Sequence, residues 1–349
     1  MKPEEGNELE VEGVLNPAVT RGPDGNLYIF PRMVAKNNYS RIGIAKVKFD
    51  AAGDPVGVER LGVVLEPEAD YEKRPNGGGG CEDPRITYVK AVEHYIMTYT
   101  AYGSKGPRIA MARSKDLFNW ERLGLVQFLP YEDIDFNGID NKDASFFPTD
   151  LPSPHNHISM AMLNRPLFPG TRPEEIVEND DTHESDEHKE SIWISYFNLK
   201  NGKETSLKNA KFTSHHCLAH PVYPWENLKI GSGAPPILTK YGWLLVYHGV
   251  RKHDDSTADQ PKYTYSAGAM ILSEKAPQKI LYRSPEPILA PELPNETIGI
   301  VGDVVFPTGT DRRDDIGQPN RIDVYYGMAD DRIGVAKMEI PDHLPKELK

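Results

Sequence analysis

The feature that most constrains the fold is an internal repeat of short strands. A strand of the form Arg-Ile-x-x-Ala occurs three times, with two looser copies between them: RIGIAKV (41–47), RIAMARS (108–114), SIWISYF (191–197), YSAGAMIL (265–272) and RIGVAKM (332–338). Each copy follows an apolar, aromatic-rich run, which itself follows another short run, whereas helical periodicity is scarce. Five three-strand units at a period of roughly 65–85 residues are typical of antiparallel sheets repeated around an axis.

The repeat predicts an all-β fold, a five-bladed β-propeller, that fills residues 1–349 as a single domain. A chain of 349 residues is also long enough for two ordinary domains, but the repeat runs through nearly all of it. The expected blades cover roughly 12–60, 80–130, 140–200, 230–285 and 300–340.

The repeat also predicts which residues meet at the mouth of the axial channel. In an antiparallel blade, the start of the innermost strand and the end of the second strand lie at the same rim. The residues that open the first runs are Asn16, Glu82, Asp83, Lys142, Asp143, Gly233 and Asp303, and those that close the second runs are Arg32, Tyr102, Arg165, His248 and Asp330. Polar groups that converge on a concave surface indicate an active site.

The stretch RPNGGGGCEDPRITYV (74–89) resembles a phosphate-binding loop only superficially. A P-loop needs a lysine and a serine or threonine after its glycines, leading into a helix, but here the glycines lead into a strand. We expect an irregular turn in which the backbone approaches the channel closely. A flexible loop is the alternative.

Asp83, the opener of the second blade, is the candidate general acid. Pro84 restricts its backbone, and burial beside Glu82 is expected to raise its pKa, which suits proton donation near neutral pH. The alternative is a structural aspartate that caps the strand or pairs with Arg85.

Several motifs together resemble glycoside hydrolase family 130, the β-mannoside phosphorylases and related β-mannosidases. They are GCEDPRIT, TAYGSKGPRIAMARSKDLFNWERLG, NKDASFFP, KIGSGAPPI, GWLLVYHGV, VVFPTG and VYYGMADDRIGVAK, in order from about residue 12 to residue 340. The resemblance implies a five-bladed propeller, in agreement with the repeat.

The resemblance also implies a reaction. The aspartate of the Glu-Asp-Pro-Arg motif, here Asp83, is the single general acid and acts through the 3-hydroxyl of the bound mannose. Phosphate attacks the anomeric carbon from the opposite face, which inverts β to α and releases α-mannose 1-phosphate. Inorganic phosphate is then a co-substrate, and no cofactor is needed. The alternative is an inverting β-mannosidase of the same family, which uses water.

The family's ligands are carried over motif by motif. The expected phosphate ligands are Lys142, Arg165, Lys229 and His248, which suit phosphate chemically but could each form ordinary salt bridges instead. The expected mannose ligands are Asn16, Arg41 and Asp303, and the rim residues Glu82, Tyr102 and Asp143 are expected to contact substrate as well. One departure is Asn164, which stands where the family has a histidine before the arginine.

The composition argues against several other classes of protein. A net charge of −12 argues against nucleic-acid or anionic-membrane binding, and no apolar run is long enough to span a membrane. Two cysteines and the absence of a signal-peptide core favour the cytoplasm. The segment TSHHCLAH (213–220) could suggest zinc, but adjacent ligands on an extended segment point to opposite sides, so we expect no metal.

Other questions stay open at this point. The acidic run 174–190 is expected to be a solvated loop, although it could border the acceptor side of the pocket or a subunit contact in a homo-oligomer. Loops 62–80 and 167–190 would select the linkage and the leaving sugar. An arabinanase-like enzyme is disfavoured because Asn16 stands where an aspartate would open the first blade, and a non-catalytic propeller would not need this polar rim.

Overall fold

The computed structural model describes residues 1–131, 134–168, 189–199, 207–257 and 259–345. It is almost entirely β, as predicted, and its described part holds one short α-helix, α1 (Pro294–Thr297), and three single-turn 3-10 helices. No helix in these ranges combines the length and apolarity that a membrane crossing would require.

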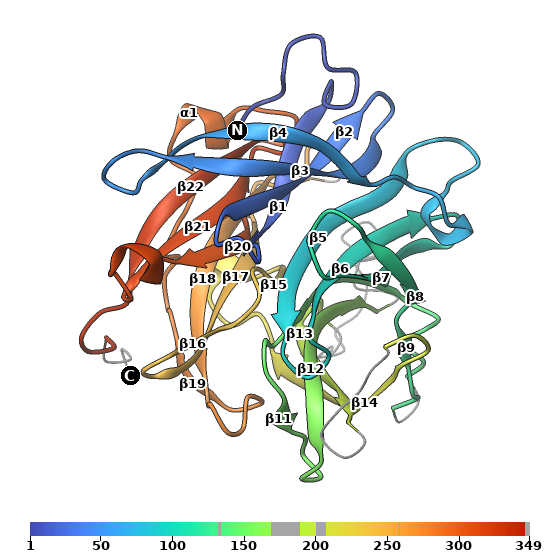
Figure 1. Cartoon of the computed structure of the whole chain (residues 1–349), viewed down its shortest axis with the longest axis vertical. Coiled ribbons are helices and arrows are strands. Elements are labelled where there is room, and N and C mark those ends of the chain that lie inside the picture. The colour runs from blue at the N-terminus through green and yellow to red at the C-terminus, as the bar shows by residue number, and fades with distance from the viewer. Residues whose placement is uncertain (132–133, 169–188, 200–206, 258, 346–349) are drawn as a thin grey trace.

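The strands form five consecutive antiparallel units (Figure 1). The first unit contains β1 (Gly13–Arg21), β2 (Leu27–Ala35), β3 (Tyr39–Phe49) and β4 (Pro55–Leu65). The second contains β5 (Gly79–Val89), β6 (His94–Gly103), β7 (Gly106–Ser114) and β8 (Glu121–Leu125). A short parallel pairing of β3 with β5 joins these two units into one sheet.

The third unit contains β10 (Asp140–Phe146), β11 (Leu151–Pro152), β12 (Ile158–Leu167), β13 (Ile192–Asn198) and β14 (Lys211–Ala219), with β9 (Gln127–Phe128) pairing β14. The fourth contains β15 (Lys229–Ser232), β16 (Ile237–Thr239), β17 (Gly242–Lys252), β18 (Tyr263–Leu272) and β19 (Ile280–Arg283). The fifth contains β20 (Val305–Arg312), β21 (Arg321–Met328) and β22 (Arg332–Glu339). The three-strand repeat thus continues into an outer strand in the first four units.

Contacts between units follow chain order. Strand β1 contacts β5, β5 contacts β10, β10 contacts β15, and β20 contacts β17 and β18. Strand β20 also contacts β1, so that the last unit packs on the first.

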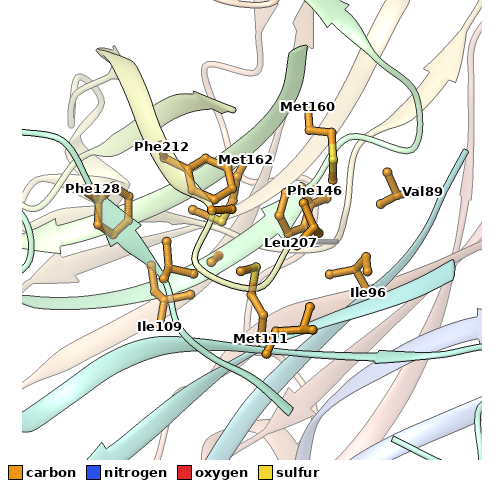
Figure 2. Packing of buried hydrophobic residues seen from close by; sticks show 14 of the residues in the cluster. Val89, Ile96, Ile109, Met111, Phe128, Phe146, Met160, Met162, Leu207 and Phe212 are labelled. Carbon is orange, nitrogen blue, oxygen red and sulfur yellow. The ribbon is translucent and has the colours of Figure 1, made fainter. Parts of the chain in front are cut away.

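The hydrophobic core is divided among the seams between neighbouring units. Figure 2 shows the seam between units two and three, where Ile96, Ile109 and Met111 face Phe146 and Met162. Four further clusters occupy the seams of units one and two, three and four, four and five, and five and one. Each apolar strand therefore has both faces covered.

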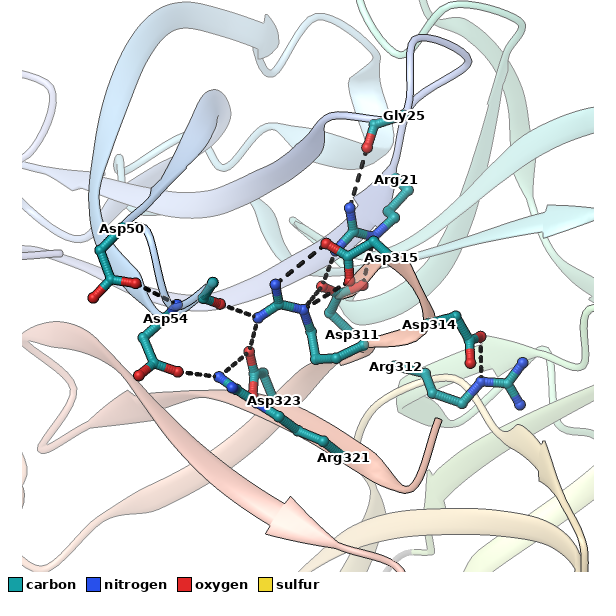
Figure 3. A network of polar contacts seen from close by, with 12 residues as sticks. Arg21, Gly25, Asp50, Asp54, Asp311, Arg312, Asp314, Asp315, Arg321 and Asp323 are labelled. Carbon is teal, nitrogen blue, oxygen red and sulfur yellow. Dashed lines mark hydrogen bonds and ion pairs between the residues drawn. The ribbon is translucent and has the colours of Figure 1, made fainter. Parts of the chain in front are cut away.

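An ion-pair network joins the two ends of the chain (Figure 3). We call Arg21, Asp54, Asp311, Arg313, Asp315, Arg321 and Asp323 the closure network. Arg21 of β1 pairs with Asp311 of β20 at 2.6 Å, and Asp323 of β21 accepts from Arg313 at 2.7 Å and Arg321 at 2.8 Å.

The glycine run ends in a tight approach between backbones. Gly79 and Gly80 have φ of +68° and +112°, and a Cβ on either would lie 2.2 Å from a main-chain oxygen, of Tyr102 and Ser40 respectively. Only glycine fits there. These glycines begin β5, and only Cys81 separates them from Glu82 and Asp83.

Candidate active site

A β-bulge opens the first strand of three units. Asn16, Asp83 and Asp143 have φ of +45°, +47° and +53°, and each lies at a register shift in β1, β5 or β10. Asn and Asp tolerate this left-handed conformation better than most residues. Because a bulge redirects side chains, the repeat places equivalent polar groups where they can meet.

Asn16, Arg32, Glu82 and Asp83 meet in what we call the acid centre. Asn16 Nδ2 donates to Asp83 Oδ1 at 2.9 Å, and Arg32 Nη1 donates to the same oxygen at 3.3 Å. Arg32 Nη2 also donates to Glu82 Oε1 at 2.9 Å. The openers of the first two units and a closer of the first therefore lie together, as the rim argument predicts.

The expected rise in the pKa of Asp83 is wrong. Burial raises its pKa, but the Arg32 and Arg85 guanidinium groups and the Asn16 hydrogen bond outweigh burial, so the pKa lies below its usual value. Burial instead dominates at two neighbours: the pKa of Glu82 is raised, and that of Asp330 is raised to about 6. Arg32, Arg85 and Asn16 therefore keep Asp83 ionised.

A second group, which we call the cation centre, surrounds Asp143. It consists of Arg85, Asp143, Arg165, Glu190, Lys229 and His248. Arg165 Nε donates to Asp143 Oδ2 at 2.6 Å, while Arg85 Nη2 and His248 Nε2 each lie 3.7 Å from that carboxylate. The charges of Arg165 and Arg85 hold the pKa of Asp143 well below its usual range despite burial.

His248 belongs to the cation centre but is not itself a cation. Burial, with the nearby Arg165 and Arg85 charges, lowers its pKa to about 3 although Asp143 opposes this. The ring packs 4.3 Å from the ring of Phe306, centroid to centroid. At neutral pH His248 therefore offers one N–H donor and no charge.

Glu190 is the main residue that sequence reasoning missed. It is buried, forms an ion pair with Arg165, and lies 3.8 Å from Lys229 Nζ. It ends the acidic run 174–190 that we expected to be solvated, and residues 174–188 of that run lie outside the described residues. Its position shows that the run reaches the site at this end.

Arg85 links the two centres. Its Nη1 donates to the main-chain oxygen of Asp83 at 2.8 Å, its Nε donates to Gly233 O at 2.7 Å, and its Nη2 faces Asp143. Sequence reasoning considered Arg85 only as a structural partner of Asp83, although the Asp-Pro-Arg motif contains it. The two centres thus form one continuous polar site.

Lys142 and Tyr102 lie beside these centres. Lys142 Nζ is 5.7 Å from the centroid of the Tyr102 ring, and its charge acts on both Glu82 and Asp83. Lys142 is also the register partner of Arg165.

Two expected substrate ligands are not brought to these centres. Arg41 Nε donates to Glu66 at 2.9 Å, and its guanidinium stacks 4.9 Å from the centroid of the Tyr39 ring. Asp303 has an exposed side chain and contacts Tyr265 through its main-chain oxygen. The side-chain amide of Asn164, the departure from the family pattern, lies 3.4 Å from that of Asn141.

Several buried polar atoms of the site have no hydrogen-bond partner within the described part of the chain. They are Asn16 Oδ1, Arg85 Nη2, and His248 Nδ1 and Nε2. Because an unpaired buried polar atom costs about 1–3 kcal/mol, such atoms commonly mark the position of a ligand.

The histidines of TSHHCLAH lie on β14, and His215 bonds Ser195 Oγ and Leu129 O. Over the described ranges, no cluster of three or more His, Cys, Asp or Glu side chains has a metal-binding arrangement. That no metal is needed stays a prediction.

Comparison with known proteins gives consistent results. Residues 4–344 match the family model Glyco_hydro_130, described as beta-1,4-mannooligosaccharide phosphorylase. A 1,2-beta-oligomannan phosphorylase from a Thermoanaerobacter species is 32% identical over 98% of this chain and 95% of its own length. A beta-1,2-mannobiose phosphorylase from the same source is 31% identical over 97% and 94%. The structure of the Listeria innocua beta-1,2-mannobiose phosphorylase, complexed with beta-1,2-mannobiose, aligns with a TM-score of 0.66 at 22% identity, covering 97% of this chain and 92% of that one.

Proposed function

The chain belongs to glycoside hydrolase family 130, and on that premise we propose that it cleaves β-mannosides by inverting phosphorolysis. The reaction transfers the mannosyl group to inorganic phosphate, giving α-mannose 1-phosphate and the acceptor sugar, and is reversible. The relatives over 30% identical are named for phosphorolysis of β-mannosides, which supports this activity.

The observation that carries the mechanism is the juxtaposition of the acid centre and the cation centre through Arg85. In the proposal, the mannosyl ring lies between the two centres. Asp83 delivers a proton, through the sugar's 3-hydroxyl, to the glycosidic oxygen on one side. Phosphate attacks the anomeric carbon from the other side, and no general base is needed because phosphate is already anionic.

The lowered pKa of Asp83 gives phosphate a second role in this proposal. Asp83 is ionised because Arg32 and Arg85 favour its charge. A phosphate bound at the cation centre would offset the charge of Arg85 and so favour proton uptake by Asp83. Phosphate would thereby favour the protonated form of Asp83, which the reaction needs, as well as act as the nucleophile.

The proposed phosphate ligands are Arg165, Lys229, His248 and Lys142, now joined by Arg85. Arg85 Nη2 and the His248 ring nitrogens are supporting evidence because they have no hydrogen-bond partner among the described residues. Asn16, Glu82, Tyr102 and Asp143 are proposed to position the mannose. We also propose that the five units are propeller blades around this site, which the ordered contacts from β1 round to β20 support.

Glu190 favours a second candidate function, inverting hydrolysis. A β-mannosidase needs a carboxylate base to activate water, and Glu190 is a buried carboxylate placed among the cations that would otherwise hold phosphate. If the enzyme is a phosphorylase, the ion pair between Glu190 and Arg165 must break when phosphate binds. If it is a hydrolase, that ion pair would remain.

The proposal needs no cofactor beyond phosphate as co-substrate. A chain with only two cysteines cannot form a disulfide framework, which suits the reducing cytoplasm that we propose for this enzyme.

A panel of β-1,2- and β-1,4-linked manno-oligosaccharides, assayed with and without phosphate, tests the function. Phosphorolysis predicts substrate consumption only with phosphate and release of α-mannose 1-phosphate. Equal turnover in phosphate-free buffer, with free mannose as product, would establish hydrolysis instead.

A further inference from the structure

The cation centre contains carboxylates among its positive groups. Asp143 is only 4% exposed, and Arg165 Nε donates to its Oδ2 at 2.6 Å. Glu190 forms an ion pair with Arg165 and lies 3.8 Å from Lys229 Nζ. A site that only had to attract negative charge would gain nothing from two buried carboxylates. These carboxylates therefore restrict which anions the centre can accept.

Of the two carboxylates, Asp143 holds the more fixed position. Ser232 Oγ donates to its main-chain oxygen. A Cβ added to Gly231 would lie 2.4 Å from both Asp143 Oδ2 and His248 Cε1, so this glycine lets the backbone of β15 pass close to the carboxylate. Glu190, in contrast, must be displaced when an anion binds. Asp143 is therefore the acceptor that a bound anion would meet.

Two buried side chains beside this carboxylate have polar atoms without a hydrogen-bond partner among the described residues. They are Arg85, through Nη2, and His248, through both ring nitrogens. Arg85 Nη2 lies 3.7 Å from Asp143 Oδ1, and His248 Nε2 lies 3.7 Å from Asp143 Oδ2, which is too long for a hydrogen bond. An anion oxygen about 2.9 Å from either side chain therefore lies within a few ångströms of the carboxylate.

The His248 ring adds a second acceptor to the centre. Burial lowers its pKa to about 3, so at neutral pH the ring has one N–H group and one nitrogen lone pair. The N–H group can donate to any anion. The lone pair can be satisfied only by a group that carries a proton.

Oxyanions differ in whether they carry such a proton. At neutral pH phosphate keeps at least one P–OH group, and arsenate keeps an As–OH group, whereas every oxygen of sulfate only accepts. Hydrogen phosphate and sulfate have the same charge and nearly the same size, so attraction to arginine does not distinguish them. Beside the ionised Asp143 carboxylate, a P–OH group forms a charge-assisted hydrogen bond, but a sulfate oxygen is repelled.

We propose that Asp143 makes the cation centre selective for oxyanions that carry a proton, phosphate and arsenate, and against sulfate. Phosphate donates its P–OH hydrogen to the Asp143 carboxylate, while Arg85 and Arg165 bind its other oxygens. The inference rests on the proposed function, because it assumes that the cation centre binds the phosphate co-substrate. It adds to the mannose contact proposed above for Asp143, since an ionised carboxylate has several lone pairs that accept.

Calorimetry with each anion alone, without a mannoside, tests this selection. We expect phosphate and arsenate to bind the wild type about 10–100-fold more tightly than sulfate, which is the contribution of one charged hydrogen bond. Fluorophosphate, which has fluorine in place of the P–OH group, should bind as weakly as sulfate. This comparison uses only the wild type, so it tests the proposal even where a substitution prevents folding.

Asp143→Asn should bring the ratio of phosphate to sulfate affinity near one, because the amide nitrogen can donate to a sulfate oxygen. A purely structural role would weaken both anions alike and keep the ratio. Asp140→Asn is the matched control, since Asp140 lies on the same strand and pairs with Arg108, and it should keep the ratio. Glu190→Gln should strengthen the binding of both anions, because its ion pair with Arg165 no longer competes, and should also keep the ratio.

The proposal would be overturned by sulfate or fluorophosphate binding as tightly as phosphate, by a lack of phosphate binding, or by a ratio that persists in Asp143→Asn. A ratio lost in Glu190→Gln instead would contradict the role of Asp143.

Two further results separate this inference from the proposed function. If phosphate is preferred over sulfate but no β-mannoside releases α-mannose 1-phosphate, the anion selection stands and phosphorolysis fails. If α-mannose 1-phosphate is released and sulfate inhibits at concentrations equal to the KM for phosphate, phosphorolysis stands and the anion selection fails.

Discussion

The active site and the closure network are both built from buried arginine and aspartate, yet they differ in how completely their polar atoms are paired. In the closure network, Arg313 donates to Asp315, Asp323 and Gly53 O, and no buried side-chain atom of the seven residues lacks a partner. In the active site, Arg85 Nη2 and both ring nitrogens of His248 have no hydrogen-bond partner among the described residues. A satisfied network holds two parts of a fold together, whereas unsatisfied polar atoms suit a ligand.

The strongest test of this comparison substitutes one aspartate in each region. Asp83→Asn should lower kcat by about 10²–10⁴-fold. The substitution removes the proposed general acid and puts an amide of nearly the same size in its place. Asp323→Asn should leave kcat unchanged and lower the free energy of unfolding, because Arg313 and Arg321 lose their shared carboxylate. Steady-state assays and urea unfolding measure both; near-normal turnover by Asp83→Asn would remove it as the acid.

Arg313→Ala should have the largest effect on stability. Its guanidinium is 1% exposed, and its loss leaves Asp323 and Asp315 without their shared partner. Breaking a buried ion pair costs about 3–5 kcal/mol. Chemical denaturation should show this loss while activity per folded molecule stays constant; a fall in kcat without a loss of stability would contradict the division between the regions.

Arg165→Ala should weaken phosphate binding, which Arg313→Ala should not, although both substitutions break a buried ion pair. A charged hydrogen bond contributes about 1.5–3 kcal/mol, which corresponds to a rise of roughly 10–100-fold in the KM for phosphate. Arg312→Ala, an exposed arginine paired with Asp314, is the matched control. An unchanged KM for phosphate in Arg165→Ala would remove this residue as a ligand.

The raised pKa of Asp330, in the active-site region, should make the free energy of unfolding depend on pH. Its pKa is raised to about 6 by burial, so the folded protein binds a proton that the unfolded chain loses near 3.8. Stability should therefore fall by about 2 kcal/mol as pH rises from 4 to above 6. Asp330→Asn has no such proton and should lack this fall; parallel stability curves for the two proteins would contradict the raised pKa.

The smallest expected effect concerns His248, whose ring should not change its protonation state near neutral pH. Its pKa, lowered to about 3, keeps the ring neutral between pH 5 and 8. The imidazole resonances in an NMR titration should stay constant over that range, whereas in the denatured chain they should titrate near 6.5. A midpoint between pH 6 and 7 in the folded protein would show that His248 is solvated.

Much of the fold follows from the sequence because inner strands have apolar side chains on both faces. The five repeat strands are β3, β7, β13, β18 and β22. The outer strands are harder to recognise: β4 is largely half-exposed, and β19 has only four residues. In the fourth unit, Pro235 and Pro236 separate β15 from β16, since proline cannot donate to the sheet.

Part of the site could be predicted from the direction of the strands. The rim argument brings Asn16, Arg32 and Asp83 together because it depends only on strand direction. It says nothing of Arg41, whose register partner is Met33, on the opposite face from Arg32. Nor could it place Glu190, because charge alone does not distinguish a solvated acid from a buried one.

The most direct test of the central claim is a crystal structure of Asp83→Asn with a β-mannoside and phosphate. We predict phosphate against Arg85, Arg165, Lys229 and His248, with Glu190 displaced from Arg165 and the mannose between the anion and residue 83. Phosphate found only elsewhere, with Glu190 still paired to Arg165 and a water beside it, would contradict phosphorolysis.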